Sequence, residues 1–343
     1  MVQAKESSHN GNSHRKPCFL ITIDAEGDNL WSKPRTVTTR NADFLPRFQL
    51  LCESYGLKPT YLANYEMAES PSFREFGRDM LKRGTGEIGM HLHAWNSPPL
   101  VPLTKSDHRF HPYLIEYPRH VMEAKIRTMT HTLEDIFGVK MVSHRAGQWV
   151  FNETYAQMLI EEGYLVDCSV TPGVSWKGLL GGLSQSVGTD YYRFPEEAYF
   201  LDPEDISRAG QSPLLEVPVT ILPTKSTVTR FLNHALRTLP LGQIILGRFL
   251  KPVYWLRPRR GNQTDLLRLV RRAVDEQRSY VEFMLHSSEL MPGGSPTFSE
   301  KEHIEALYRD LHVLFNEIRG AFVGATLTDY YSSHLRVGKN KAG

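Results

Sequence analysis

Short apolar segments of strand length alternate with longer segments of helical period along most of the chain. The first apolar segment, residues 18–24, is followed by a helical pattern over 42–56 and a second apolar segment over 59–64. The same alternation continues to the C-terminus. Predicted strands cover 18–24, 59–64, 87–93, 140–145, 165–170, 214–221, 279–286 and 321–327, and predicted helices cover 42–56, 70–83, 118–137, 152–163, 264–277 and 299–319.

Residues at the ends of the helical segments carry signals that start and stop helices. Ser70 followed by Pro71 is typical of an N-cap and a first helical turn. Ser299 with Glu302 three residues later has the pattern of a capping box. Gly138 and Gly163 follow the last residues of two helical patterns, where glycine commonly ends a helix.

Repeated strand–helix units favour an α/β fold with a parallel sheet, and seven or eight units fit a closed or nearly closed barrel better than a two-domain doubly wound sheet. We expect one barrel domain over residues 18–335. Residues 1–17 are polar and are predicted to be disordered, and residues 336–343 are predicted to be a flexible tail.

Composition and charge exclude several classes of protein. The 343 residues are 41% hydrophobic and carry a formal net charge of +2, so the chain has enough apolar residues for a core and no global charge for nucleic acid. Residues 1–17 lack the apolar region of a secretory signal, which predicts a cytoplasmic protein. Cys18, Cys52 and Cys168 are widely spaced and are expected to be buried thiols.

One segment breaks the alternation. Val217 to Gln263 contains no acidic residue, and its basic residues are interspersed with large apolar ones, so an insertion is expected at about 222–263. It is either a long connection packed on the barrel or a basic surface for peripheral membrane contact or a polyanionic substrate. The basic residues are Lys225, Arg230, Arg237, Arg248, Lys251, Arg257, Arg259 and Arg260.

Titratable residues stand at the C-terminal ends of four predicted strands. In a parallel β/α barrel these ends meet at one face, where active sites are built. We therefore expect these side chains to gather at one rim. They are Asp24, Glu26, Asp28, His91, His93, His144, Arg145, His286 and Glu289.

His91 and His93 alternate with an apolar residue, so both imidazoles point to one side of an extended strand. With a carboxylate from the first strand they form a two-histidine, one-carboxylate set suited to Zn²⁺. The alternative is one ligand and one hydrogen-bonding partner. Asp24 and Glu26 share the same alternation, so one can bind the metal while the other accepts a proton.

Two further residues complete a set for amide hydrolysis. Arg145, at the neighbouring strand end, can hold the free carboxylate ionised through a bidentate contact. His286, from across the barrel, can donate a proton to a leaving amine. Trp95, Trp149 and Trp176 offer aromatic faces on which sugar rings can stack, with packing in the core as the alternative.

Six segments occur in the order and spacing of one protein family. They are TIDAEGD (22–28), EIGMHLHAW (87–95), SHRAGQW (143–149), VDCSV (166–170), LLEVPV (214–219) and FMLHSSEL (283–290). Over residues 18–330 the chain resembles the polysaccharide deacetylase superfamily (NodB homology, carbohydrate esterase family 4), in a divergent branch. The resemblance implies a distorted (β/α) barrel of about seven strands and metal-dependent removal of an N-acetyl group from an amino sugar.

The resemblance also implies roles for individual residues. The base of the family maps to Asp24, its base-orienting arginine to Arg145 and its general acid to His286. His91 transfers as a metal ligand, with a divalent metal, most simply Zn²⁺, as the cofactor. We assign Trp95, Trp149 and Asp167 of VDCSV to substrate binding.

The sequence departs from the family in two places. Asp24-Ala25-Glu26 replaces a pair of adjacent aspartates, so Glu26 is the expected carboxylate ligand, with Asp24 and Asp28 as alternatives. The family separates its two histidines by three residues, whereas His93 follows His91 by two, so His93 as the second ligand rests on strand alternation. If His93 is not the second histidine ligand of the metal, His108 and His111 are the next candidates for that ligand.

These residues predict a metal-dependent hydrolase that removes an N-acetyl or N-formyl group from an amino sugar. A cytoplasmic enzyme would meet a lipid-linked or nucleotide-linked precursor of a surface polysaccharide, with possible membrane association through 222–263. The alternatives are hydrolysis of a non-sugar amide and a catalytically inactive carbohydrate-binding barrel. No nucleic-acid partner is expected.

Overall fold

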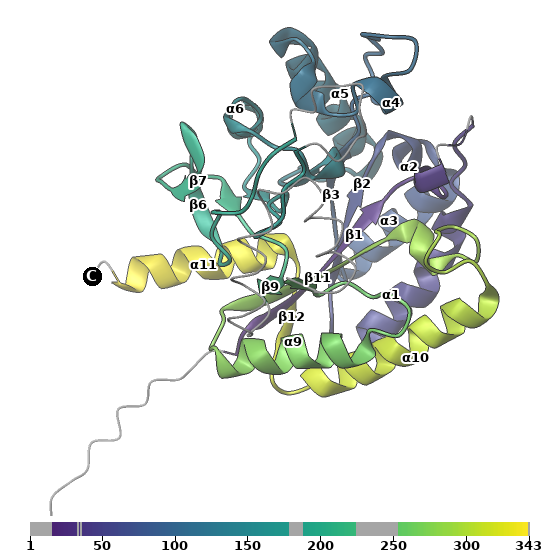
Figure 1. The fold of residues 1–343 in the computed structure, drawn as a ribbon, viewed down its shortest axis with the longest axis vertical. Coiled ribbons are helices and arrows are strands. Elements are labelled where there is room, and N and C mark those ends of the chain that lie inside the picture. Colours follow the sequence, from purple (N-terminus) through teal and green to yellow (C-terminus); the bar gives the residue numbers. More distant parts are fainter. Residues whose placement is uncertain (1–15, 33, 35, 178–187, 224–252, 342–343) are drawn as a thin grey trace, which may run out of the picture.

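The computed structural model describes residues 16–32, 34, 36–177, 188–223 and 253–341. Figure 1 shows strands at the centre with helices around them. The strands are β1 (Cys18–Ala25), β2 (Pro59–Ala63), β3 (Glu87–Leu92), β4 (Ser143–Ala146), β5 (Val166–Asp167), β6 (Tyr199–Asp202), β7 (Asp205–Ala209), β8 (Leu215–Glu216), β9 (Ile221–Pro223), β10 (Val253–Trp255), β11 (Tyr280–His286) and β12 (Val323–Ala325). The α-helices are α1 (Leu45–Ser54), α2 (Tyr65–Glu69), α3 (Pro71–Arg83), α4 (Asp107–Phe110), α5 (Arg119–Phe137), α6 (Glu153–Glu162), α9 (Gln263–Asp275), α10 (Lys301–Ile318) and α11 (Leu327–Lys341).

The main sheet is a curled parallel sheet, as predicted. Its strand order is β11-β1-β2-β3-β4-β5-β8-β6-β7, with β12 beside β1. The run from β11 to β8 is parallel, and the hairpin β6–β7 adds antiparallel strands after β8. Between β8 and β11, the Leu256 amide donates to the Thr220 carbonyl and the Met284 amide donates to the Leu256 carbonyl. The α/β barrel-like fold expected from the sequence is confirmed.

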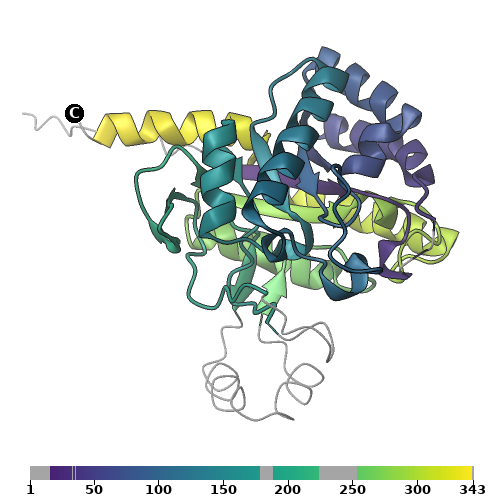
Figure 2. The same cartoon turned by 90° about the horizontal axis from the view of Figure 1, so that it is seen from above.

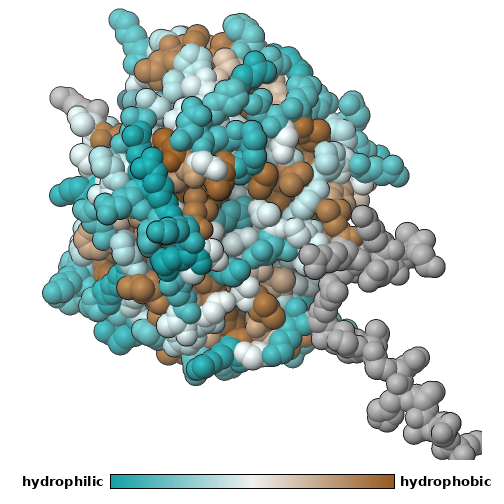
Figure 3. All heavy atoms as spheres, turned by 180° about the vertical axis from the view of Figure 1, so that it is seen from behind, coloured by the Kyte–Doolittle hydropathy of each residue, from teal (hydrophilic) through white to brown (hydrophobic). Residues whose placement is uncertain are grey.

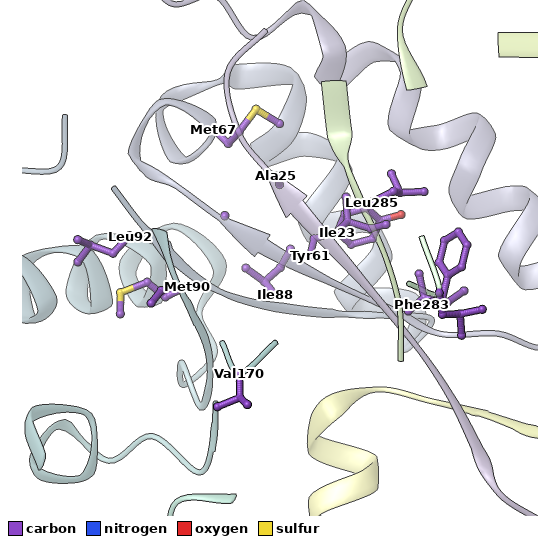
Figure 4. Packing of buried hydrophobic residues seen from close by; sticks show 14 of the residues in the cluster. Ile23, Ala25, Tyr61, Met67, Ile88, Met90, Leu92, Val170, Phe283 and Leu285 are labelled. Atoms are coloured by element: carbon purple, nitrogen blue, oxygen red, sulfur yellow. The ribbon is translucent and has the colours of Figure 1, made fainter. Parts of the chain in front are cut away.

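The two sides of the central strands carry different side chains. In β1, Ile21, Ile23 and Ala25 belong to the large hydrophobic core, and Figure 4 shows Ile23 and Ala25 among labelled core residues of β2, β3 and β11. Successive side chains of a strand point to opposite faces, so Thr22 and Asp24 lie on the inner side of the curled sheet. The polar residues of the strands are therefore collected inside the barrel.

Amphipathic helices cover the outer side of the sheet. In α10, the buried residues repeat at helical spacing, among them Leu307, Leu311 and Leu314. Phe315 of this helix packs edge-on against Phe19 of β1, with ring centroids 6.1 Å apart. Figure 2 shows α11 running out along one side of the molecule toward the C-terminus. The expected start of a flexible tail at residue 336 falls within α11.

The strand and helix predictions fit most of the described chain, with differences at the ends and between elements. Ser70 caps α3 by accepting from the Phe73 amide at 3.5 Å, as predicted. The predicted cap Ser299 is wrong by one residue, because Glu300 is the N-cap of α10 and its amide bonds to His303 Nδ1 at 3.3 Å. The N-terminal segment 1–15 and most of the expected insertion, 224–252, lie outside the described residues.

No helix within the described ranges combines the length and apolar character needed to cross a membrane. On the face shown in Figure 3, hydrophobic residues form separate patches among polar ones. The three cysteines are free thiols, with Cys52 and Cys168 buried and Cys18 partly buried.

Candidate metal centre and active site

Strand register brings the predicted residues together at the C-terminal ends of four strands. Asp24 of β1 is opposite His286 of β11, and His91 of β3 is opposite Arg145 of β4. All four residues are buried or nearly so. The rim expected from the sequence therefore exists, and these side chains lie on its inner side.

Glu26, His91 and His93 form a compact cluster in which each residue offers one ligand atom. These atoms all lie within 4.8 Å of one another. Glu26 Oε2 is 3.7 Å from His91 Nε2 and 3.4 Å from His93 Nε2. All three residues are buried. The cluster joins the end of β1 to the end of β3.

The two histidines are held in different ways. His91 Nδ1 lies 3.0 Å from the Arg145 carbonyl and donates to it, which leaves the Nε2 lone pair facing Glu26. His93 stacks on Trp95, with ring centroids 4.4 Å apart and planes inclined by 24°. Burial lowers the pKa of both histidines, so both are neutral at neutral pH and can act as ligands.

These three residues fit a divalent metal ion such as Zn²⁺. Two ligand atoms bound to one zinc ion at about 2.1 Å with tetrahedral geometry lie about 3.4 Å apart, close to the separations found here. Burial raises the pKa of Glu26 to about 7, and a cation beside this carboxylate would favour its ionised form. The carbonyl bonded to His91 Nδ1 is the kind of outer partner that metal-binding histidines usually have.

Asp24 is held by a buried arginine. Arg145 Nη1 donates to Asp24 Oδ1 at 2.5 Å, Nη2 donates to Thr22 and to Glu282, and Nε donates to the Cys168 carbonyl at 3.0 Å. Burial alone would raise the pKa of Asp24, but Arg145 and the neighbouring histidines hold it well below its usual range. The Asp24 carboxylate is therefore ionised beside the metal cluster.

Asp28, the third carboxylate of the motif at residues 22–28, forms hydrogen bonds with Thr38 and Asn41. Its oxygens accept from the Asn41 side chain at 2.7 Å, the Asn41 amide at 2.9 Å and the Thr38 hydroxyl at 2.8 Å. Ser287 and Asn41 in turn bond to the backbone of Glu26. Asp28 thus supports the loop that carries Glu26, and its own oxygens face that loop.

His286 presents one nitrogen to the cluster and the other to a charged pair. Its Nε2 lies 3.7 Å from Asp24 Oδ2 and 3.8 Å from Glu26 Oε1. Its Nδ1 lies 3.0 Å from Arg257 Nη2 and 3.3 Å from Glu289 Oε2. Burial would raise the pKa of Glu289, but Arg257 and His286 lower it to about 2. Trp31 contacts the His286 ring edge-on at 4.9 Å.

Asp167 does not lie with the other predicted site residues. It is opposite His144 in the β4–β5 register, and His144 points away from the side on which Arg145 lies. The Asp167 carboxylate is fully buried, 2.6 Å from His144 Nδ1, and accepts from the Ser169 amide at 2.9 Å. Asp167 is thus buried between the sheet and the helices that cover its outer side, and this position contradicts the substrate-binding role assigned to it.

The tryptophans named from the sequence border the cluster. The Arg145 guanidinium carbon lies 4.7 Å from the centre of the Trp149 ring, and Trp149 stacks on Trp176 at 6.4 Å. Trp149 is only 7% exposed, so its face is mostly covered by these neighbours. Trp95 is half-buried beside His93. His108 and His111 are not part of the cluster around Glu26.

Sequence reasoning gave no role to Glu282 or Trp31 and did not foresee how Arg257 and Glu289 meet at His286. Glu282 is a single acidic residue inside an apolar strand, and this pattern in the sequence already indicates a buried charge that needs a partner. The pairing of Arg257 with Glu289 joins residues 32 positions apart, and only the fold shows it.

The loop that carries His93 is fastened by a buried lysine. Lys125 of α5 is 1% exposed, and its Nζ donates to the carbonyls of Ser97 at 2.6 Å and Pro99 at 2.7 Å. Asn96 donates from the same loop to Glu66 at 2.6 Å. These bonds fix the segment that follows β3, and with it the position of His93 and Trp95.

We expect Lys125→Met to lower the free energy of unfolding by ~2–4 kcal/mol, because two buried carbonyls lose their donor. Urea denaturation measures this loss, and metal affinity should fall with it as the His93 loop loosens. Lys140→Met is the matched control, since Lys140 is 84% exposed and pairs with Glu134 on the surface, where such a pair is worth about 0–1 kcal/mol. Equal effects of the two changes would contradict this role of Lys125.

Comparisons with known proteins show the fold. No family model matches the chain, and neither does any curated protein sequence. The structure resembles that of a Mycobacterium smegmatis protein described as a polysaccharide deacetylase, with a TM-score of 0.52 and 16% identity, covering 94% of this chain and 92% of that one.

Two further solved structures are similar at lower scores. Puue allantoinase has a TM-score of 0.49 at 13% identity, covering 92% of this chain and 88% of that one. The Xyl-CE4 domain of a xylanase from a Trinervitermes trinervoides hindgut metagenome has a TM-score of 0.44 at 10% identity, covering 93% and 92%. The fold assignment rests on the Mycobacterium smegmatis structure, and it agrees with the resemblance seen in the sequence motifs.

Proposed function

We propose that the chain is a metal-dependent amide hydrolase that removes an N-acetyl or N-formyl group from an amino sugar. The observation that carries this proposal is the meeting of three groups on one rim. The Glu26–His91–His93 cluster offers metal ligands, Asp24 is an ionised base held by Arg145, and His286 faces both carboxylates. The fold shared with the Mycobacterium smegmatis protein supports the same reaction class.

Glu26, His91 and His93 would hold the metal ion, and Zn²⁺ suits two imidazoles and a carboxylate. When bound, such an ion polarises a carbonyl oxygen and lowers the pKa of water. Asp24 is the carboxylate that is not assigned to the metal, and it can therefore take part in proton transfer. Its Oδ1 accepts a hydrogen bond from Arg145, which leaves Oδ2 for the proton.

The remaining residues divide the proton transfers. Asp24 accepts a proton from the water that attacks the amide carbon, and Arg145 keeps this carboxylate in place. His286 Nε2 gives a proton to the departing amine nitrogen, so that the bond between carbon and nitrogen breaks to give a carboxylic acid and a free amine. Glu289 orients the protonated His286 ring by accepting from its Nδ1–H, and Arg257 in turn donates to the Glu289 carboxylate.

The aromatic surroundings of the cluster support a sugar as the substrate. Trp31, which is 40% exposed, and the half-buried Trp95 flank His286 and His93. Aromatic faces of this kind stack on the apolar faces of sugar rings. A sugar precursor linked to a lipid or a nucleotide is the substrate that we favour. Of the basic residues considered for membrane contact, Arg257 turns toward His286 and Glu289.

The proposal is tested by acetate release from N-acetylated amino sugars before and after removal of metal. We expect the purified chain to lose activity on dialysis against a chelator and to regain it with about one equivalent of Zn²⁺ per chain. N-formyl sugars and N-acetyl amino acids, assayed in parallel, distinguish the acyl group and a non-sugar amide. Full activity after chelation would contradict a metal-dependent reaction, and a purified chain that holds no metal and hydrolyses no amide would indicate the catalytically inactive carbohydrate-binding barrel.

A further inference from the structure

Arg257 lies beside His286 on the loop between β10 and α9, and Arg259 follows it two residues later in the same loop. Arg257 reaches His286 Nδ1 and Glu289 with one nitrogen, Nη2, and makes no other side-chain hydrogen bond within the described part of the chain. Its Nε and Nη1 are therefore available as donors. The Arg257 side chain is 16% exposed, so it borders the site without being sealed inside it.

The loop is shaped so that Arg259 lies next to Arg257. Asn262 accepts from the Arg259 amide at 2.8 Å and donates to the Arg257 carbonyl at 2.9 Å. Along the segment Leu256 and Pro258 are buried, Arg257 is partly buried and Arg259 is exposed. Partial desolvation and the positive charge of Arg257 lower the pKa of Arg259, while the negative charge of Glu289 acts in the opposite direction.

Within the described residues, one carboxylate, that of Glu289, forms an ion pair with this pair of arginines. Glu289 is the carboxylate that pairs with Arg257, and no described carboxylate lies within ion-pair distance of Arg259. The segments outside the described residues contain a single acidic residue, Glu6, and residues 178–187 and 224–252 contain none. The Glu289 carboxylate therefore faces two guanidinium groups, because its charge acts on Arg259 as well as on Arg257.

We propose that Arg257 and Arg259 form a subsite for a phosphate-class anion carried by the substrate. This inference rests on the proposed function, because His286 is there the residue that protonates the leaving amine. The anion would accordingly be attached to the amine-bearing sugar and not to the acyl group. Guanidinium groups bind phosphate through paired, charge-assisted hydrogen bonds, which suits two adjacent arginines with free donors.

The source of such an anion is either a soluble sugar phosphate or the phosphate that links the sugar to a membrane lipid. The test compares Arg259→Gln with Arg260→Gln, which removes the same charge from the exposed next residue of the loop. Both variants leave Arg257 and the residues around the metal cluster unchanged. The soluble probe is N-acetylglucosamine 1-phosphate, with N-acetylglucosamine as its uncharged match. The lipid probe is vesicles containing phosphatidylglycerol, with phosphatidylcholine vesicles as reference.

Calorimetry on the purified chain, as isolated and after chelator treatment, gives binding without relying on turnover. We expect the sugar phosphate to bind at least tenfold more tightly than the neutral sugar, Arg259→Gln to remove this preference and Arg260→Gln to change it less than twofold. If the anion is a headgroup, co-sedimentation with phosphatidylglycerol vesicles should show the same difference between the variants. Equal effects of the two substitutions, or no preference for either anionic probe, would overturn the subsite.

Kinetics separate this subsite from the proposed reaction. Arg259→Gln should raise KM for the sugar phosphate about tenfold while kcat stays within twofold, and should leave the neutral sugar unaffected. Hydrolysis with the same KM for both sugars in the wild type would remove the subsite and leave the hydrolase intact. Anion binding that depends on Arg259, in a chain that hydrolyses no amide, would keep the subsite and remove the proposed function.

Discussion

Replacing Asp24 by asparagine is expected to lower kcat by ~10²–10⁴ while the protein keeps its metal, because a positioned general base contributes about this much to proton transfer. Asparagine has the same shape but cannot accept the proton. The metal should remain, since Glu26, His91 and His93 are the residues whose ligand atoms gather within 4.8 Å. Steady-state kinetics together with metal content per chain measures both effects.

The surroundings of Asp24 predict that this variant still folds. Arg145 would lose one ionised partner but would keep the Glu282 carboxylate, the Thr22 hydroxyl and the Cys168 carbonyl. An arginine left with no carboxylate in the interior would cost several kcal/mol. Burial and the negative charge of Asp24 raise the pKa of Glu282 to about 7, so removal of the Asp24 charge favours ionised Glu282 as the remaining counter-charge of Arg145.

Asp28→Asn is the matched control for this prediction. It makes the same chemical change on a neighbouring buried carboxylate, one that bonds to Thr38 and Asn41. We expect its kcat to fall less than tenfold and its effect to appear mainly as lower stability of the loop. If Asp24→Asn loses the metal while Glu26→Gln retains it, the roles of the two carboxylates are reversed.

The sequence predicts the fold and most of the rim because these depend on local pattern. Alternating apolar residues fix which side of β1 and β3 faces the helices, and this places Asp24 and His91 on the inner side. The strand ends then need only to be parallel and adjacent for their polar residues to meet. The register observed between β1 and β11 supplies this by placing Asp24 opposite His286.

What the sequence does not give depends on contacts between distant segments. Asp167 lies in a family motif, yet the register with His144 turns it to the outer side, and a motif match does not specify that side. The partners of His286 come from a loop and a 3₁₀ turn far apart in the chain. The hairpin β6–β7 is not predicted either, since its strands are only four and five residues long.

The position of the second histidine is where the family spacing and this structure differ most. The family spacing would place a histidine at position 95, where the chain has Trp95. The structure instead brings His93 Nε2 to 3.4 Å from Glu26, with Trp95 stacked on the far side of the ring. Trp95 thus takes part in the site as a support for the imidazole.

His91→Ala and His93→Ala should each weaken Zn²⁺ binding more than about 100-fold and abolish activity, because loss of even an outer partner of a metal ligand costs 10–100-fold. Each variant should stay folded, since the large hydrophobic core lies on the other side of β3. Zinc content by mass spectrometry and thermal unfolding measure binding and folding separately. The controls His108→Ala and His111→Ala remove histidines outside the cluster and should retain about one ion per chain. Normal zinc content in His93→Ala, with loss in either control, would move the second ligand to the loop after β3 and remove the two-residue spacing from the metal site.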